Sequence, residues 1–209
     1  MWERYYSALH RLPRRLTEPV PLVVELLPTL RRRTLGIALD LGCGTGRHCV
    51  YLARNKFDVI GVDTSETALR MANRWVRKER LSSVTFVRGT IASLPFGKNR
   101  FDAVIGISVI HHAMKKDISK TTAEIYRTLK KGGIFFANLI SVKDPRYGTG
   151  EQVEKNTFRI PEAFEERRFE ELHHFFTKKD VSGLLSRFAE TRIGLLREKP
   201  YYWKATCIK

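Results

Sequence analysis

A glycine-rich segment at residues 40–46, with the sequence DLGCGTG, has the composition of a small-molecule cradle. An apolar run at residues 37–39 precedes it like a buried strand, and residues 48–54 follow it like a helix. Glycines at such a strand-to-helix turn adopt positive φ angles and let a ligand lie against bare backbone. Asp63 ends the next apolar run, where a carboxylate accepts hydrogen bonds from a ribose diol. The order of these features predicts a nucleotide-type binding site.

The glycine spacing and one further acid narrow the choice of nucleotide. Dinucleotide sites usually have the pattern G-x-G-x-x-G, whereas this chain has G-x-G-x-G followed by Arg47. Asp40, just before the glycines, would repel a pyrophosphate but attract an ammonium group. S-adenosylmethionine carries adenosine at one end and an ammonium at the other, so Asp40 and Asp63 match its charge and length. On these residues alone, a nicotinamide or flavin dinucleotide, or a turn without a ligand, stays open.

Alternating strands and helices must position these residues. Helical patterns follow the glycine segment, start at Thr64 or Ser65, and span residues 116–130 with Gly132 as a stop. A βαβα alternation of this kind predicts an α/β fold with a parallel sheet and helices on both faces. Apolar runs predict strands at residues 37–41, 58–62, 84–87, 101–109 and 134–140.

The chain of 209 residues is predicted to form a single domain with an ample core. Residues 1–34 form a helical cap, in which Trp2, Tyr5 and Tyr6 either close over the cofactor or pack as ordinary helix aromatics. Residues 35–141 form the cofactor-binding core, and residues 142–176 a substrate-side insertion rich in charge. Residues 177–209 are predicted to contain a helix capped by Thr177 and Asp180, strands at 193–196 and 201–208, and a turn at 198–200.

The net charge of the chain indicates which kinds of partner it could bind. The formal net charge of +16 suggests nucleic acid, an anionic metabolite or an acidic surface, although a bias of the host proteome would give the same balance. No apolar run approaches the ~20 residues that span a bilayer, and the N-terminus lacks the apolar stretch of a secretory signal. The three cysteines form no C-x-x-C pair and are expected to be reduced thiols. These features predict a cytoplasmic protein without a membrane partner.

Five segments of the chain resemble the class I S-adenosylmethionine-dependent methyltransferases of the small methyltransferase-domain type. They are LDLGCGTGRH at 39–48, VIGVDTSE at 59–66, LPF at 94–96, FDAVIGISVIHH at 101–112 and EIYRTLKKGG at 124–133. The resemblance implies a Rossmann-like, seven-stranded, mostly parallel sheet in the order 3-2-1-4-5-7-6, with strand seven antiparallel and helices on both faces. It implies S-adenosylmethionine as the cofactor and names no acceptor.

The same resemblance assigns roles to individual residues. It places Asp63 at the ribose, and Ser108 near the methionine amine and the transferred methyl group. The family often has an acid at position 90 to accept from the adenine amine, whereas Thr90 brings only a hydroxyl. The residues implied at the methionine end are Asp40, Gly42, Gly44 and Gly46, and those implied near the adenine are Thr64, Thr90 and Ile91.

Two histidine pairs are the candidates for proton transfer. His111 and His112 follow the predicted strand at 101–109, at the sheet edge where ligands bind, so either could take a proton from an acceptor. Each could instead cap a helix or pack beneath the insertion. His173 and His174 precede the last helix and could reach the same cleft. Two adjacent pairs are poor spacing for one metal site, so no metal is expected.

These features predict an enzyme that transfers a methyl group from S-adenosylmethionine to a small-molecule acceptor by in-line displacement. A transfer RNA or other RNA is the alternative acceptor, because of the net charge of +16 and because SVIHH at 108–112 resembles wobble-uridine tRNA methyltransferases. A catalytically silent, cofactor-sensing scaffold is the third possibility. The chain lacks the (D/N)-P-P-(Y/F) motif of N6-adenine methyltransferases after residues 101–109.

Overall fold

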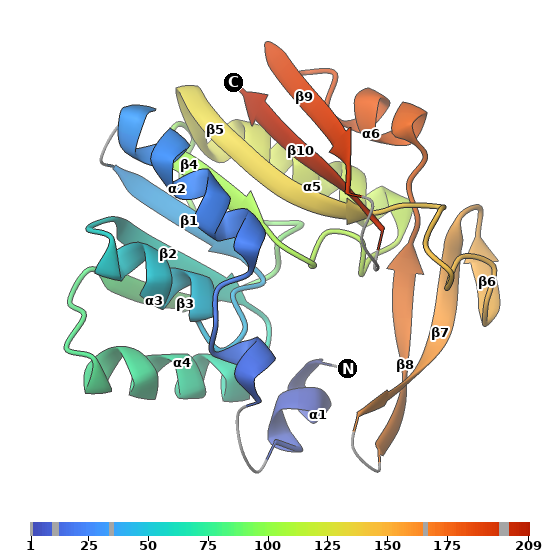
Figure 1. Cartoon of the computed structure of the whole chain (residues 1–209), viewed down its shortest axis with the longest axis horizontal. Coiled ribbons are helices and arrows are strands. Elements are labelled where there is room, and N and C mark those ends of the chain that lie inside the picture. Colours follow the sequence, from blue (N-terminus) through green and yellow to red (C-terminus); the bar gives the residue numbers. More distant parts are fainter. Residues whose placement is uncertain (1, 10–12, 34–35, 165–166, 197–200) are drawn as a thin grey trace.

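The computed structural model describes residues 2–9, 13–33, 36–164, 167–196 and 201–209. A large central sheet lies between helices, and a smaller sheet stands beside it (Figure 1). Among the described residues, no helix combines the length and apolarity that a bilayer crossing requires. Cys43, Cys49 and Cys207 are buried, and none of them forms a disulfide in the described residues.

The central sheet has seven strands in the order β3-β2-β1-β4-β5-β10-β9. Counted within this sheet alone, this is the predicted order 3-2-1-4-5-7-6; the labels differ because β6, β7 and β8 precede β9 in the chain. The first five strands pair in parallel, and β10 is antiparallel to both of its neighbours. The strands are β1 (Ile37–Leu41), β2 (Asp58–Asp63), β3 (Val84–Arg88), β4 (Phe101–Gly106), β5 (Leu129–Ile140), β9 (Glu190–Leu195) and β10 (Tyr202–Ile208).

Helices cover both faces of the sheet, because its central strands are apolar on both sides. α2 (Pro21–Arg33) and α3 (Arg47–Arg54) share a core with Ala38 of β1. α5 (Lys115–Thr128) and α6 (Lys178–Leu184) share the opposite core with Leu39 of β1. Successive residues of β1 therefore point to opposite helix layers. α4 (Glu66–Lys78) flanks β2 and β3.

Both predicted N-terminal helix caps, at α4 and at α6, are present. Ser65, and not Thr64, caps α4, and its hydroxyl accepts a hydrogen bond from the Ala68 N–H at 3.1 Å. At α6, Thr177 and Asp180 form the predicted capping box. Each cap satisfies N–H groups that a helix start leaves without a partner.

Several predicted boundaries were wrong. β5 begins at Leu129 and not at residue 134, and β9 spans Glu190–Leu195 and not 193–196. β4 ends at Gly106 and not at Val109, because the chain turns at Ser108, whose φ is +52°. α5 ends at Thr128, and Gly132, the predicted helix stop, lies inside β5 with a φ of +76°. The Gly132 N–H donates instead to the Lys209 carbonyl at 2.8 Å, so this glycine shapes the sheet. The predicted turn at 198–200 lies outside the described residues.

The insertion at 142–176 forms a three-stranded antiparallel sheet that the sequence analysis did not predict. Its strands are β6 (Glu151–Glu154), β7 (Thr157–Phe164) and β8 (Arg167–His174). Phe158, Ile160 and Phe175 pack with Ile140 at the end of β5. The His174 N–H donates to the His111 carbonyl at 2.7 Å, which joins β8 to the loop after β4. The small sheet therefore reaches the carboxyl edge of the large one.

The N-terminal segment packs against the opposite side of that edge. α1 (Trp2–Ser7) contacts α4, and Tyr6 and Leu9 share a small core with Ala68. A short 3-10 helix (Arg14–Leu16) connects this region towards α2. In Figure 1, α1 and β8 lie on either side of the region towards which the first strands point.

A tight contact under the glycine turn gives the first testable prediction. A Cβ on Gly61 of β2 would lie 2.8 Å from both Cys43 Sγ and a Phe86 ring carbon. Gly61→Ala should therefore lower the free energy of unfolding by about 1–3 kcal/mol through overpacking. Gly194→Ala, in a strand where nothing lies within 4 Å of the added Cβ, is the matched control. Denaturant titration of both variants tests this; equal stability of the two would contradict the packing argument.

Candidate active site

A cavity of about 540 Å³ opens at the carboxyl ends of β1, β2 and β4, beneath α1. Parallel α/β sheets bind their ligands at this edge. α5 contributes Asp117 and Lys120 to the wall, which the sequence analysis did not identify. Seven of the predicted site residues line the cavity: Gly42, Asp63, Thr64, Thr90, Ile91, Ser108 and His112.

Four predicted site residues do not line the cavity: Asp40, Gly44, Gly46 and His111. Asp40 is 1% exposed and points under the first turn of α3, where the Cys49 thiol lies 3.4 Å and the His48 imidazole 3.9 Å from its carboxylate. Asp40 therefore does not face the cavity directly, and its contact with a ligand ammonium group stays a prediction. Gly44 adjoins the wall, because its N–H donates to Asp63 at 2.9 Å.

Asp63 ties the glycine turn to the start of α4. Its carboxylate accepts hydrogen bonds from the Gly44 N–H at 2.9 Å and the Ser65 N–H at 2.8 Å. Burial raises the pKa of Asp63 above its ordinary value, and these two backbone bonds oppose the rise. A buried carboxylate held in this way faces the cavity with a fixed orientation.

Two glycines of the cradle leave no room for a side chain. Gly42 has a φ of +59°, and a Cβ there would lie 2.3 Å from a Val109 methyl group. Gly44 has a φ of +54°, and a Cβ there would lie 2.5 Å from the Tyr6 hydroxyl oxygen. Positive φ and close approach together explain why glycine occupies both positions.

Aromatic residues of α1 roof the cavity. Trp2 and Tyr6 both line it, and the Trp2 ring meets the His112 ring edge-on with centroids 5.2 Å apart. Tyr5 packs against Tyr6 at 5.1 Å. α1 therefore packs on α4 and also lines the cavity, whereas closure of these aromatic residues over the cofactor stays a prediction.

Glu3 anchors this roof to α4 and gives the second prediction. Its carboxylate accepts hydrogen bonds from the Ser65 hydroxyl at 2.7 Å, the Thr67 N–H at 3.2 Å and the Thr67 hydroxyl. These bonds lower the pKa of Glu3 to about 2, so the ionised anchor persists until pH falls below the ordinary carboxyl range. Glu3→Gln should weaken S-adenosylmethionine binding by roughly threefold to tenfold, the equivalent of about one hydrogen bond.

Calorimetric titration of S-adenosylmethionine into the variant measures this effect. Glu25→Gln is the control, because Glu25 forms an ion pair with Lys204 at 2.9 Å and does not line the cavity. An unchanged affinity in Glu3→Gln would show that α1 does not contribute to the site.

His112 is the histidine that faces the cavity. Its Nδ1 lies 3.2 Å from the Leu172 carbonyl of β8, to which it donates. Burial lowers the pKa of His112 to about 4, although the nearby Glu171 carboxylate opposes the shift. His111 lies behind it, 1% exposed, and burial holds its pKa well below the ordinary value. Both imidazoles are therefore neutral near pH 7.

β8 brings one residue of the second histidine pair to the first. The His173 and His112 ring centroids are 4.7 Å apart, and His173 Nε2 lies 2.9 Å from Glu171 Oε2. His174 points elsewhere and bonds to the Thr157 hydroxyl at 2.7 Å. Glu171 was missed by the sequence analysis. Residues two apart in a strand lie on the same face, so Glu171 and His173 lie side by side in β8. Because β8 was not predicted, this neighbourhood was not recognised from the sequence.

Ser108 occupies the bend between β4 and His112. Its N–H donates to Asn138 Oδ1 at 2.6 Å, and Asn138 Nδ2 donates back to the Ser108 hydroxyl at 3.3 Å. Asn138 is buried in β5, which fixes the bend from the neighbouring strand. The predicted position of Ser108 at the end of β4 is thus shifted into the loop that lines the cavity.

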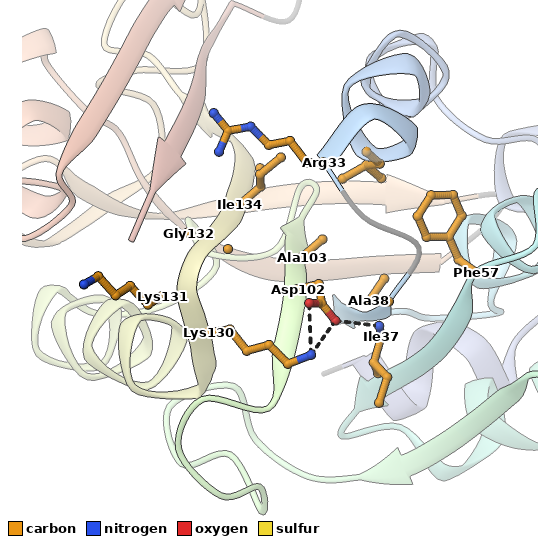
Figure 2. A pocket seen from close by; sticks show the side chains of 13 residues that line it. Arg33, Ile37, Ala38, Phe57, Asp102, Ala103, Lys130, Lys131, Gly132 and Ile134 are labelled. Carbon is orange, nitrogen blue, oxygen red and sulfur yellow. Dashed lines mark hydrogen bonds and ion pairs between the residues drawn. The ribbon is translucent and has the colours of Figure 1, made fainter.

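A smaller cavity of about 80 Å³ lies at the opposite, amino edge of the sheet (Figure 2). There Asp102 accepts hydrogen bonds from Lys130 Nζ at 2.9 Å and from the Ile37 N–H at 2.9 Å. These bonds connect the starts of β1, β4 and β5, and they satisfy the carboxylate within the protein. We therefore assign this region a structural role.

Comparison with protein families identifies the core. Residues 39–137 match the model of the family described as "Methyltransferase domain". The uncharacterized methyltransferase sll0829 of Synechocystis is 37% identical over 97 residues, which are 46% of this chain and 43% of that protein. The sterol 24-C-methyltransferase erg6 of Aspergillus fumigatus is 34% identical over 99 residues, 46% of this chain and 26% of that protein. The matched segment thus spans less than half of the length of these relatives.

Solved structures share the fold over most of the chain. The PH0226 protein of Pyrococcus horikoshii has a TM-score of 0.73 and 24% identity, covering 89% of this chain and 88% of that one. The 1,6-didemethyltoxoflavin-N1-methyltransferase of Burkholderia thailandensis, solved with 1,6-didemethyltoxoflavin and S-adenosylhomocysteine, has a TM-score of 0.65 and 21% identity. It covers 91% of this chain and 77% of that one.

Proposed function

We propose that this chain, which belongs to the class I S-adenosylmethionine-dependent methyltransferases, transfers the methyl group of S-adenosylmethionine to a small-molecule acceptor. One observation carries the proposal. A single cavity is lined in spatial order by Thr90 and Ile91 after β3, Asp63 at the end of β2, Gly42 after β1, and Ser108 and His112 after β4. This order matches adenine, ribose, amino acid and methyl group along the cofactor.

The chemistry needs alignment more than acid catalysis. A sulfonium is an activated methyl donor that becomes a neutral thioether when the methyl group leaves. The protein therefore has to hold nucleophile, methyl carbon and sulfur in line, and to exclude water from the reacting centre. The roof of Trp2 and Tyr6 over the cavity supports such an enclosed reaction.

His112 is the proposed proton acceptor for a nucleophile that loses a proton. It lines the cavity, whereas His111 does not. Donation from Nδ1 to the Leu172 carbonyl leaves the lone pair on Nε2 as the basic atom. We do not extend this role to His111, because that imidazole is buried behind the wall.

A small acceptor is supported by the names of two similar proteins and by the cavity. A sterol 24-C-methyltransferase and a didemethyltoxoflavin methyltransferase both name small molecules as substrates. Asp117 and Lys120 of α5 add a polar wall, which favours an acceptor with charged or hydrogen-bonding groups. The acceptor need not be anionic, since the wall offers both signs of charge.

RNA is a second candidate acceptor because of the net charge of +16. A basic stripe on α4, formed by Arg70, Arg74, Arg77 and Lys78 at helical spacing, is where an RNA backbone would bind. Arg70 of this stripe already pairs with Glu66 at 2.8 Å. α4 also flanks β2 and β3, on the adenine side of the proposed cofactor position. An RNA on that stripe would have to extend around the domain to reach His112.

Transfer of radiolabelled methyl groups separates the candidates. The full chain is incubated with tritiated S-adenosylmethionine and either a metabolite extract or bulk tRNA. We expect label in the metabolite fraction, and little in tRNA. Label in tRNA alone would overturn the small-molecule proposal, particularly if tRNA binding also weakened steeply with salt. Absence of transfer to any acceptor would instead favour a cofactor-sensing scaffold.

A further inference from the structure

We propose that His111, His112 and His173 form a binding site for one divalent transition-metal ion, of the Zn²⁺ class, at the acceptor end of the cavity. The three imidazoles come from the loop after β4 and from β8. They offer one ligand atom each, and these atoms all lie within 4.8 Å of one another. The site is argued from this geometry and does not depend on the identity of the acceptor.

The ring arrangement fits three ligands around a common centre. The ring centroids are 4.2 Å apart for His111 and His112, 4.7 Å for His112 and His173, and 5.9 Å for His111 and His173. A tetrahedral ion with nitrogen ligands at about 2.1 Å would separate ring centroids by roughly 5 Å. Small side-chain rotations would thus bring the ligand atoms to bonding distance.

One of the three imidazoles has a buried nitrogen without a hydrogen-bond partner among the described residues. His111 is 1% exposed, and among the described residues its Nδ1 has no hydrogen-bond partner. Buried polar atoms are nearly always satisfied, so such an atom calls for an explanation. A metal ion at the triad would use this lone pair.

His112 and His173 make hydrogen bonds of the kind that metal-binding histidines make through their second ring nitrogen. Glu171 Oε2 lies 2.9 Å from His173 Nε2, and the Leu172 carbonyl lies 3.2 Å from His112 Nδ1. Metal-binding histidines usually donate their second N–H to a carboxylate or a carbonyl, which fixes the tautomer and the ring orientation. Here these bonds leave the lone pairs on His173 Nδ1 and His112 Nε2.

One carboxylate lies directly beside the triad. Glu171 Oε1 lies 3.2 Å from His112 Nδ1, whereas the Arg146 guanidinium forms an ion pair with Asp144 at 2.9 Å. Imidazole ligands suit Zn²⁺, Ni²⁺ or Fe²⁺ and not Mg²⁺ or Ca²⁺, which require oxygen.

The metal site was not predicted from the spacing of the histidines in the sequence. Two adjacent histidine pairs are poor ligand spacing for one metal site, so no metal was expected from the sequence. The rings of His111 and His112 converge because the chain turns there instead of continuing as a strand, and β8 supplies His173 while His174 turns to Thr157. The site therefore takes both residues of the first pair and only His173 of the second.

Metal titration of the full chain tests the proposal. After treatment with a chelator and buffer exchange, ZnSO₄ and CoCl₂ are titrated against the protein, with calorimetry for Zn²⁺ and visible absorption for Co²⁺. We expect one equivalent of tight binding and intense Co²⁺ bands typical of low coordination number. His173→Gln should weaken binding at least tenfold, and His111→Gln likewise. His174→Gln, one residue away but outside the triad, should leave binding unchanged.

Failure of the metal site and failure of the proposed function give different results in these experiments. Binding of S-adenosylhomocysteine to each variant reports whether the fold and the cofactor site are intact. No Zn²⁺ binding by a protein that binds S-adenosylhomocysteine, or equal binding by the His173→Gln and His174→Gln variants, would overturn the metal site alone. In that case His112 keeps its role as a metal-free base. Failure of S-adenosylmethionine binding would overturn the function whatever the metal result.

Discussion

Replacing Asp63 with alanine is expected to weaken S-adenosylmethionine binding by tenfold or more, a loss of about 1.4 kcal/mol or greater. Two effects add. The variant removes the carboxylate proposed to accept from the ribose hydroxyls, and it leaves the N–H groups of Gly44 and Ser65 without their acceptor. The glycine turn would then lose its link to α4.

Isothermal titration calorimetry measures this loss directly. Asp58→Ala is the matched control, because Asp58 is exposed at the other end of the same strand. Asp63→Asn tests the two contributions separately, since the amide oxygen can still accept from one N–H while the charge is gone. Undiminished affinity in Asp63→Ala would show that the cofactor does not lie over β2.

Replacing His112 with alanine is expected to lower kcat by about 10²–10⁴-fold, the usual contribution of a positioned proton acceptor. Binding of S-adenosylmethionine should change little, because the predicted cofactor contacts are made by Asp63 and the glycine cradle. The expectation holds for an acceptor that loses a proton on attack and for a His112 whose Nε2 lone pair carries no metal ion.

Single-turnover transfer of labelled methyl groups to the identified acceptor is the measurement. His174→Ala serves for comparison, because that side chain is buried beside Thr157 and lies outside the cavity wall. If His112→Ala retained full kcat, the acceptor would have to be a nucleophile without a proton to lose, and the assigned role would fail.

The sheet was predictable from sequence because its strands are apolar on both faces and alternate with helices. The insertion was not, because Pro161 and the charged residues of β7 and β8 hide the alternation that a strand normally shows. Glu171 and His173 share a face only once β8 is recognised. The contacts of these two residues with His112 therefore could not be derived from spacing along the chain.

The side-chain alternation along β1 could have predicted which face of the sheet carries Asp40. Leu39 and Leu41 of β1 pack in the core that contains α5, and Ala38 packs in the core that contains α3. The period of two along a strand puts Asp40 on the face of Ala38, under α3. The carboxylate was predicted at the ligand from its charge, its position before the glycine turn and the family resemblance, whereas the alternation directs it towards His48 and Cys49.

A crystal structure with S-adenosylhomocysteine bound tests the central claim most directly. The account predicts the ribose on Asp63, the adenine beside Thr90 and Ile91, and the sulfur directed towards Ser108 and His112 beneath Trp2. A cavity that stayed empty at saturating ligand, or a nucleoside bound with its sulfur directed away from β4, would contradict it.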